Sequence, residues 1–175
     1  MGTYAGKIKF SVSATPIETL TDGESTTHLV PQSTAAGTIG GDGEITMAAM
    51  QDAGGANYGY ENGVKYYASA AIGSLGDLTA TAIDFAVVKH TGFQGAAGTT
   101  KGTTASTDTL QVAVHNGSTA VTCGLLTAGE AMVIPLRGLS ATAHKIQIRS
   151  VATGSLPGSL ANGSAIIQVE YWAST

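Results

Sequence analysis

The chain has 175 residues, of which 24 are glycine and 11% are charged, and its formal net charge is −4. Ordinary soluble domains carry about 25% charged residues, so we expect a largely neutral surface rich in hydroxyl groups. General nucleic-acid binding rests on clustered Lys and Arg, and the eight basic residues of this chain are scattered, which argues against nucleic acid as a partner.

Length and cysteine usage predict one domain over residues 1–175 that buries its core without a disulfide or a metal. The single Cys123 excludes an intramolecular disulfide, and the Cys and His residues lack the spacing of a structural zinc site. No signal-peptide pattern follows Met1, and no run approaches the ~20 apolar residues that span a bilayer. We therefore expect no membrane partner.

The first predicted strand is Lys7 to Ala14, in which apolar and polar residues alternate. The same period of two predicts core-facing side chains in five later segments. These are Ile83, Phe85 and Val87; Leu110, Val112 and Val114; Met132, Ile134 and Leu136; Ile146 and Ile148; and Ile167, Val169 and Tyr171. On the opposite face, a substitution of Arg149 is expected to matter little to folding.

Turn residues separate these segments. Asp or Asn precedes Gly at Asp22-Gly23, Asp42-Gly43, Asn62-Gly63, Asn116-Gly117 and Asn162-Gly163, and such pairs tolerate the positive φ of tight turns. Pro135 cannot donate a ladder hydrogen bond, so its strand is expected to end there or to lie at an edge. Many short strands with glycine-rich turns predict an all-β fold, an antiparallel β-sandwich or barrel.

Two segments depart from this pattern. The segment from Glu44 to Ala53 contains good helix formers and is flanked by glycines. We therefore expect the fold to contain at most one short helix, located in this segment. Lys89 to Asp108 is almost entirely Gly, Ala, Thr and Ser, and loops longer than ~12–15 residues are usually functional or disordered. This loop is either a partner-facing arm or a surface excursion without a partner.

Residues that carry chemistry in enzymes do not form a motif here. The histidines are His28, His90, His115 and His144, and the carboxylates considered for an acid–base pair are Asp84, Glu130 and Glu170. The histidines lack ligand spacing and are expected at surfaces or strand ends, and the carboxylates are expected on solvated strand faces or turns. Cys123, in an apolar context, is expected to be an inert, buried or half-buried thiol. We therefore expect no enzyme activity, catalytic residue, cofactor or metal.

Aromatic residues are the candidates for an interface. Four tyrosines, Tyr58, Tyr60, Tyr66 and Tyr67, surround the Asn62-Gly63 turn. Tyrosine combines apolar area with a polar tip and is enriched at interfaces. One interpretation is that the cluster forms a subunit contact or a sugar-stacking patch. The other is that Tyr66 or Tyr67 lies in the core and the remaining tyrosines cover the turn. Trp172 lies opposite the core-facing residues of its strand, where it caps the sheet or meets another chain.

The strand succession of the last hundred residues resembles a known class of proteins. The segments "DFAVVKHTG", "TLQVAVHNG", "GLLTAGEAMVIPL", "HKIQIRSVA" and "IIQVEYWA" resemble small β-sandwich structural proteins of tailed bacteriophages, in the head-decoration, cement and fibre-like class. The resemblance covers residues 80 to 173. It includes a turn with Leu126, Gly129 and Glu130 that leads into a strand from Met132 through Pro135.

The resemblance implies a jelly-roll-like sandwich that is made in the host cytoplasm and assembles on the virion. It implies a non-enzymatic decoration or cement protein that stabilises the shell, with the major capsid protein as partner. We also expect the chain to form a homo-oligomer on the capsid lattice, and a trimer is one of the arrangements considered. Residues 1–60 lie outside the resemblance and are expected to include an N-terminal arm. The alternative is a receptor- or glycan-binding module of a tail fibre, with Tyr58, Tyr60 or Trp172 as stacking platforms.

Overall fold

The computed structural model describes residues 6–14, 18–22, 25–29, 39–47, 60–61, 64–79, 83–136, 144–155 and 158–174. The chain divides into two compact units, Ala5–Met47 and the remainder, Met1–Tyr4 with Ala48–Thr175. The secondary structure of the described residues is all β, without a helix. The prediction of one domain over residues 1–175 stays a prediction.

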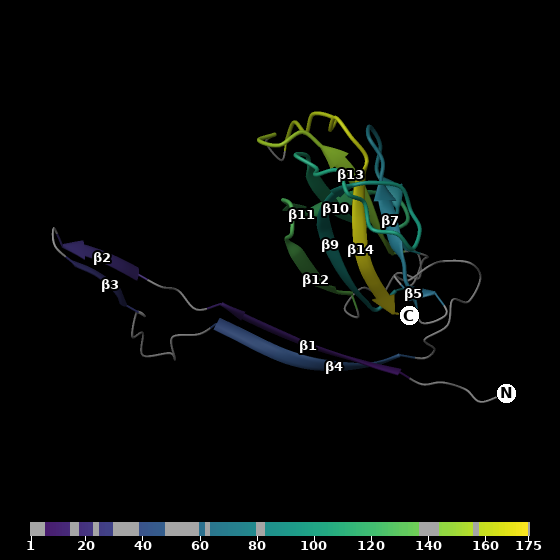
Figure 1. Cartoon of the computed structure of the whole chain (residues 1–175). Helices are drawn as coiled ribbons and strands as arrows, with labels where there is room; N and C mark the ends of the chain where they lie inside the picture. The colour runs from purple at the N-terminus through teal and green to yellow at the C-terminus, as the bar shows by residue number, and fades with distance from the viewer. Residues whose placement is uncertain are drawn as a thin grey trace. The chain divides into compact units, whose positions relative to one another are not determined.

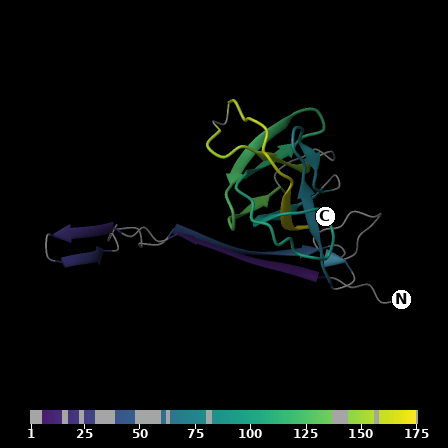
Figure 2. The same cartoon turned by 45° about the horizontal axis from the view of Figure 1, so that its top comes forward.

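The unit Ala5–Met47 contains two two-stranded antiparallel sheets, drawn in purple and blue in Figure 2. Strand β1 (Gly6–Ala14) pairs with β4 (Ile39–Met47), and β2 (Glu18–Asp22) pairs with β3 (Ser25–Leu29). The strand predicted from Lys7 to Ala14 is thus confirmed.

Strand β4 overturns two predictions. The predicted turn Asp42-Gly43 lies inside the strand, opposite Ser11 and Phe10 of β1. Residues 44–47, predicted as the start of a helix, are strand as well, and residues 48–53 lie outside the described residues. A ladder along the whole of β1 satisfies backbone groups over nine residues, which outweighs the weak local preference for a helical turn.

The second unit contains two four-stranded antiparallel sheets, which Figure 1 shows in teal, green and yellow. Sheet I has the order β12 (Ala131–Pro135), β9 (Phe85–Gln94), β14 (Ile167–Ser174) and β7 (Tyr67–Ala70). Sheet II has the order β11 (Ala120–Leu126), β10 (Thr109–His115), β13 (Lys145–Val151) and β8 (Gly76–Asp77). The short strands β5 (Tyr60–Glu61) and β6 (Val64–Lys65) pair separately.

The eight strands of the two sheets pair in a nested order. Strand β7 pairs with β14, β8 with β13, β9 with β12, and β10 with β11. Two further ladders, β9 with β14 and β10 with β13, join these pairs within each sheet. The chain from β7 to β14 is therefore paired like one long hairpin, with successive strand pairs assigned alternately to the two sheets.

A single hydrophobic cluster draws side chains from both sheets. It confirms as core residues Leu110, Val112, Ile134, Leu136, Ile146, Ile148, Ile167, Val169 and Tyr171, with Val114 and Met132 packed against it. In β9 the predicted phase is only partly right: Ile83 belongs to the cluster and Phe85 is fully buried, but Ala86 and Val88 join the cluster while Val87 is half-buried. The run "FAVV" is apolar in both phases, so only its register with β12 and β14 decides which side faces the core.

The turn predictions have mixed outcomes. Strand β12 lies at the edge of sheet I and ends at Pro135, as predicted. Asn116-Gly117 forms the β10–β11 turn, with Gly117 at a φ of 93°. Gly163 has no positive φ; Asn162 instead forms a bridge with Val151. Gly23, Asn62 and Gly63 lie outside the described residues.

Candidate interaction surface

The predicted interface aromatics occupy different places. Tyr58 lies outside the described residues, and Tyr60 lies in β5 opposite Lys65, its side chain also outside them. Tyr66 is half-buried between β6 and β7, while Tyr67 is buried with 7% of its surface exposed. Trp172 is half-buried in β14. Of these five aromatic residues, Tyr66 and Trp172 are seen to keep exposed surface.

Trp172 belongs to an apolar row on the outer face of sheet I. Val87 of β9 is paired with Val133 of β12 on one side and with Trp172 of β14 on the other. Directly opposite residues share a face, and these three alternate with the core residues Val88, Ile134 and Tyr171. All three are half-buried, so the row is partly open to a partner.

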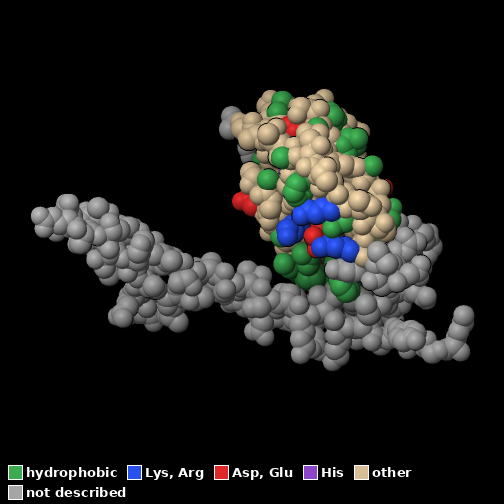
Figure 3. Space-filling model, viewed as in Figure 1, with side chains coloured by type: hydrophobic (Ala, Val, Ile, Leu, Met, Phe, Trp, Pro, Cys, Tyr) green, Lys and Arg blue, Asp and Glu red, His purple; other side chains and the backbone are tan. Residues whose placement is uncertain are grey.

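A charged row lies beside the apolar one. Glu170 is paired with Lys89, which is exposed, and with Tyr67. The Nζ of Lys65 lies 2.6 Å from Oε1 of Glu170 and 5.7 Å from the centroid of the Tyr67 ring. Figure 3 shows basic side chains gathered around an acidic one over β9 and β14, next to an apolar patch. This outer face therefore combines basic and apolar groups, although the whole chain is acidic.

The predicted loop Lys89–Asp108 is shorter than expected and is tied to sheet I. Residues 89–94 belong to β9. Beyond them, the buried side chain of Gln168 accepts a hydrogen bond from Gly102 N at 2.8 Å and donates to Thr100 O at 2.9 Å. Tyr67 and Gly98 exchange two backbone hydrogen bonds of 2.7 and 2.9 Å. The loop thereby covers part of the outer face instead of extending away from it.

Asp108, at the end of this loop, is a buried carboxylate that sequence reasoning missed. Its Oδ2 accepts hydrogen bonds from Ser164 N at 2.7 Å and Ala165 N at 2.8 Å, and Ser150 Oγ donates to it at 3.3 Å. Burial opposes ionisation, but these hydrogen bonds outweigh it and hold the pKa of Asp108 below its ordinary value. No sequence signal distinguishes Asp108, because its partners lie more than 40 residues away along the chain.

The side chain of His90 is hydrogen-bonded to the backbone of Asp108. Its Nε2 lies 3.1 Å from Asp108 O, and its Nδ1 accepts a hydrogen bond from Gly92 N at 2.9 Å, so Nε2 carries the proton and donates. Burial lowers the pKa of His90 and keeps the ring neutral. The expectation of a surface or strand-end histidine is wrong here, because His90 lies inside β9 and its fully buried ring closes the loop onto that strand.

This group of residues holds the loop in place rather than aligning a nucleophile. Ser150 and Ser164 donate to the Asp108 carboxylate, and the His90 ring bonds to the Asp108 carbonyl. A serine nucleophile that uses histidine as its base needs its hydroxyl hydrogen-bonded to the imidazole. The observed hydrogen bonds instead join the loop, β13 and the segment before β14.

The three carboxylates considered for acid–base chemistry have separate settings. Glu130 is exposed in the β11–β12 turn, as predicted, where its Oε2 accepts a hydrogen bond from Thr127 N at 2.7 Å. That hydrogen bond lowers the pKa of Glu130. Glu170 lies on the strand face as predicted and is ion-paired with Lys65, and Asp84 is half-buried just before β9.

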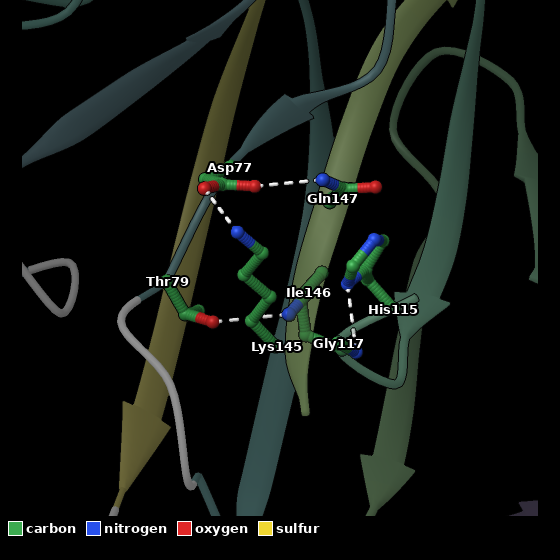
Figure 4. A network of polar contacts seen from close by, with 7 residues as sticks. All are labelled: Asp77, Thr79, His115, Gly117, Lys145, Ile146 and Gln147. Carbon is green, nitrogen blue, oxygen red and sulfur yellow. Dashed lines mark hydrogen bonds and ion pairs between the residues drawn. The ribbon is translucent and has the colours of Figure 1, made fainter. Parts of the chain in front are cut away.

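Polar side chains also connect the strands of sheet II (Figure 4). Asp77 of β8 accepts from Lys145 Nζ at 2.5 Å and from Gln147 Nε2 at 2.7 Å. Arg149 donates to Gln111 Oε1 at 2.5 Å and to Gly73 O at 2.7 Å. The expectation that a substitution of Arg149 matters little to folding is therefore revised. The Arg149 side chain connects β13 to β10 and to the segment before β8.

The remaining candidate ligands are dispersed. His28 lies in β3, its side chain outside the described residues; His144 is buried with Nε2 2.6 Å from Ile83 O; and the Nδ1 of His115 accepts from Gly117 N. Cys123 is exposed, contrary to the prediction, while partial desolvation raises its pKa. Among the described side chains, no three His, Cys, Asp or Glu groups come together as metal ligands.

Comparisons of the chain with protein-family models, with curated proteins and with solved structures found no match. Within the described residues, the structure has no helix long and apolar enough to cross a membrane.

Proposed function

We propose that this chain is a non-enzymatic structural protein of a virion, which binds the outer surface of the major capsid shell and stabilises it. The observation that carries the proposal is the nested pairing of β7 to β14 in two four-stranded sheets. Eight strands wound in this order correspond to a jelly-roll sandwich, an arrangement that recurs in viral capsid proteins and lectins. We propose that fold for the second unit.

A fold hosts many functions, so the proposal also needs support from the surface. The ladder between β1 and β4 places Ile8 opposite Ile45 and Lys9 opposite Glu44. By alternation, one face of this two-stranded ribbon carries the apolar positions, namely Ile8, Phe10, Val12, Ala14, Ile39, Ile45 and Met47. The other face carries Lys7, Lys9, Ser11, Ser13, Asp42, Glu44 and Thr46.

Such a ribbon favours attachment to another surface. Within the described residues, no third strand joins β1 or β4, and a two-stranded ribbon alone is marginally stable in water. An apolar face of this kind is stabilised when another surface covers it. This is the behaviour expected of the N-terminal arm of a protein that binds a capsid lattice, where few charges reduce desolvation on contact.

The proposal is tested on particles purified from the source of the chain. Quantitative mass spectrometry should find hundreds of copies per particle, and absence from the particles would refute the proposal. For the contact itself, shells that lack the protein are incubated with the purified full chain and sedimented. Phe10→Asp should weaken binding by about tenfold or more, since it places a charge on the apolar face. The matched variant Ser11→Asp adds the same charge to the polar face and should bind as the wild type.

A glycan-binding module of a tail fibre is the second candidate, favoured by the half-buried Trp172 on the outer face of sheet I. Aromatic side chains with exposed surface are suited to stacking on ligands. A glycan array tests it: binding that Trp172→Ala abolishes, together with only a few copies per particle, would replace the first proposal by this one.

A further inference from the structure

Acidic and basic residues are segregated along the chain. No lysine or arginine lies between Lys9 and Lys65. The same stretch contains seven carboxylates, namely Glu18, Asp22, Glu24, Asp42, Glu44, Asp52 and Glu61. A chain with this distribution carries both charge signs of a complementary contact in different segments.

The hairpin of β2 and β3 has its charged and its large apolar positions on one face. Residues that lie directly opposite each other in the ladder share a face, and successive residues alternate between faces. One face, called here the acidic face, carries the positions of Glu18, Leu20, Asp22, Ser25, Thr27 and Leu29. The opposite face carries those of Thr19, Thr21, Thr26 and His28. The acidic face therefore combines carboxylates with leucines.

The outer face of sheet I is basic at one end of β14. Gln168, Glu170 and Trp172 alternate with the core residues of β14, so they follow one another on this face. The Gln168 side chain is hydrogen-bonded to the backbone of the residues on both sides of Lys101. Lys101 is exposed there, and its Nζ lies 4.5 Å from the centroid of the Phe93 ring. The loop thus adds a lysine beside the first of these outward positions.

Two further lysines flank the next outward position, Glu170. Lys89 lies directly opposite Glu170 in the ladder, and Lys65 is ion-paired with it. One carboxylate therefore lies among three lysines, and basic charge is in excess (Figure 3). The carboxylate of Glu130, in the turn before β12, is hydrogen-bonded to Thr127 N instead. The apolar row of sheet I follows at the third outward position, so this face combines lysines with apolar side chains.

The ladder of β1 and β4 holds the hairpin away from the point where the chain leaves the unit Ala5–Met47. Ala14 pairs with Ile39 at the end next to the hairpin, and Gly6 pairs with Met47 at the other end. Nine paired positions span about 27 Å at ~3.4 Å per residue. The chain continues toward β5 from Met47, so the ribbon acts as a spacer between that point and the hairpin. A spacer of this length favours contact with a neighbouring copy.

We propose that the acidic face of the β2–β3 hairpin docks on the outer face of sheet I of a second copy of this chain. Carboxylates beside leucines then meet lysines beside an apolar row, and such complementarity steers association and fixes register. A two-stranded hairpin is marginally stable alone, so a covering sheet also stabilises it. Strands of five residues cover less than a standard interface, and we therefore expect a weak contact that salt weakens further.

Cross-linking between labelled and unlabelled copies tests the contact. Equal amounts of ¹⁵N-labelled and unlabelled full-length chain are mixed at low salt and treated with a carbodiimide, which joins a carboxylate to an amine in direct contact. Carboxylates of the acidic face should be joined to lysines of sheet I in peptides that contain one labelled and one unlabelled half. The Lys65–Glu170 cross-link within one copy is the positive control. Hairpin cross-links only between halves of the same label, or the control cross-link alone, would overturn the proposal.

Charge reversal on each side tests it independently. Lys89→Glu and Glu18→Lys should each weaken self-association about fivefold or more in sedimentation equilibrium. An equimolar mixture of the two variants should recover it, because intact hairpins of one variant meet intact sheets of the other. Ser118→Glu, in the exposed β10–β11 turn, and Thr19→Lys, on the opposite face of the hairpin, are matched controls that should associate as the wild type. If circular dichroism shows Lys89→Glu to be unfolded, Lys101→Glu replaces it.

Wild-type protein that stays monomeric at low salt up to about 1 mM would overturn the proposal. So would self-association that neither charge reversal weakens, or variants whose mixture shows no recovery. The inference does not depend on binding to a capsid. Phe10→Asp lies in β1 and tests attachment of the ribbon to the shell, whereas these variants lie in the hairpin and in sheet I, so either proposal can fail alone.

Discussion

The side-chain Oε1 of Gln168 accepts a hydrogen bond from the backbone N–H of Gly102, 66 residues earlier in the chain, at 2.8 Å. Gln168 lies in β14 with 1% of its surface exposed, and its amide also donates to Thr100 O and Ala96 O. One buried side chain thus satisfies backbone groups of a loop that contains no regular structure of its own between residues 95 and 108.

Gln168→Leu should release this loop. The substitution keeps a similar volume but leaves the half-buried Gly102 N without its partner, and a buried group left unsatisfied costs about 1–3 kcal/mol. We expect faster amide exchange from Gly98 to Gly102 and a lower free energy of unfolding. Gln94→Leu removes a comparable but exposed hydrogen bond, to Ala105 O, and should have a smaller effect. Unchanged exchange in Gln168→Leu would contradict this role.

Protonation of Asp108 should make the protein less stable in acid. Its pKa is lower in the folded than in the unfolded chain, so its contribution is present above the unfolded value and is lost as the pH falls through the folded one. The loss should begin below the ordinary Asp pKa of about 3.9. Urea unfolding of wild type and Asp108→Asn between pH 2 and 7 measures it. The stability difference between them should be largest near neutrality and shrink at low pH; a pH-independent difference would exclude this linkage.

His90 should act in a higher pH window with the same sign. Burial lowers its folded-state pKa, so stability is full above the unfolded His value of about 6.5 and decreases as the pH falls below it. Protonation would also remove Nδ1 as acceptor for Gly92 N. His90→Gln should flatten the stability profile between pH 4 and 7 and leave the Asp108 transition at lower pH. Titration of His90 by NMR at or above its ordinary pKa would contradict the prediction.

Ile148→Ala should destabilise the fold by about 2–5 kcal/mol, the range for removing most of a buried aliphatic side chain. Ile148 is 2% exposed and belongs to the core cluster. The control Val121→Ala, at an exposed position, should change the free energy of unfolding by less than about 0.5 kcal/mol. Equal effects of the two substitutions in denaturant unfolding would show that the register of β13 is wrong.

Gly163→Ala should destabilise the second unit although the φ of Gly163 is not positive. A Cβ there would overlap Ser150 Oγ and approach Asp108 Oδ2 to 3.0 Å, so the buried hydrogen bonds of the carboxylate must shift. Gly158→Ala is the matched control, because a Cβ at that position meets nothing within 4 Å. Thermal unfolding should show a lower Tm for the first variant alone.

The proposed interaction sites were only partly accessible from the sequence. The pattern predicted that Trp172 lies opposite the core residues of its strand, and its half-buried setting beside Val87 agrees with that. It did not predict that β11 lies at the edge of sheet II, because edge position depends on which strands pair. Cys123, which is exposed, was expected to be buried or half-buried for the same reason: an apolar context indicates a strand, but not whether a neighbour covers it.

The sequence by itself determined the strands whose alternation is unambiguous, such as Lys7–Ala14 and Ile167–Tyr171, and the strand end at Pro135. Those features follow from the period of two and from the missing N–H of proline, both of which are local. Only the tertiary structure decided that residues 44–47 pair with β1, that Ala86 and Val88 of β9 face the core, and that His90 and Asp108 are buried together. These outcomes depend on pairing and burial between residues far apart in the chain, whose free energies exceed the local preferences that a sequence pattern reports.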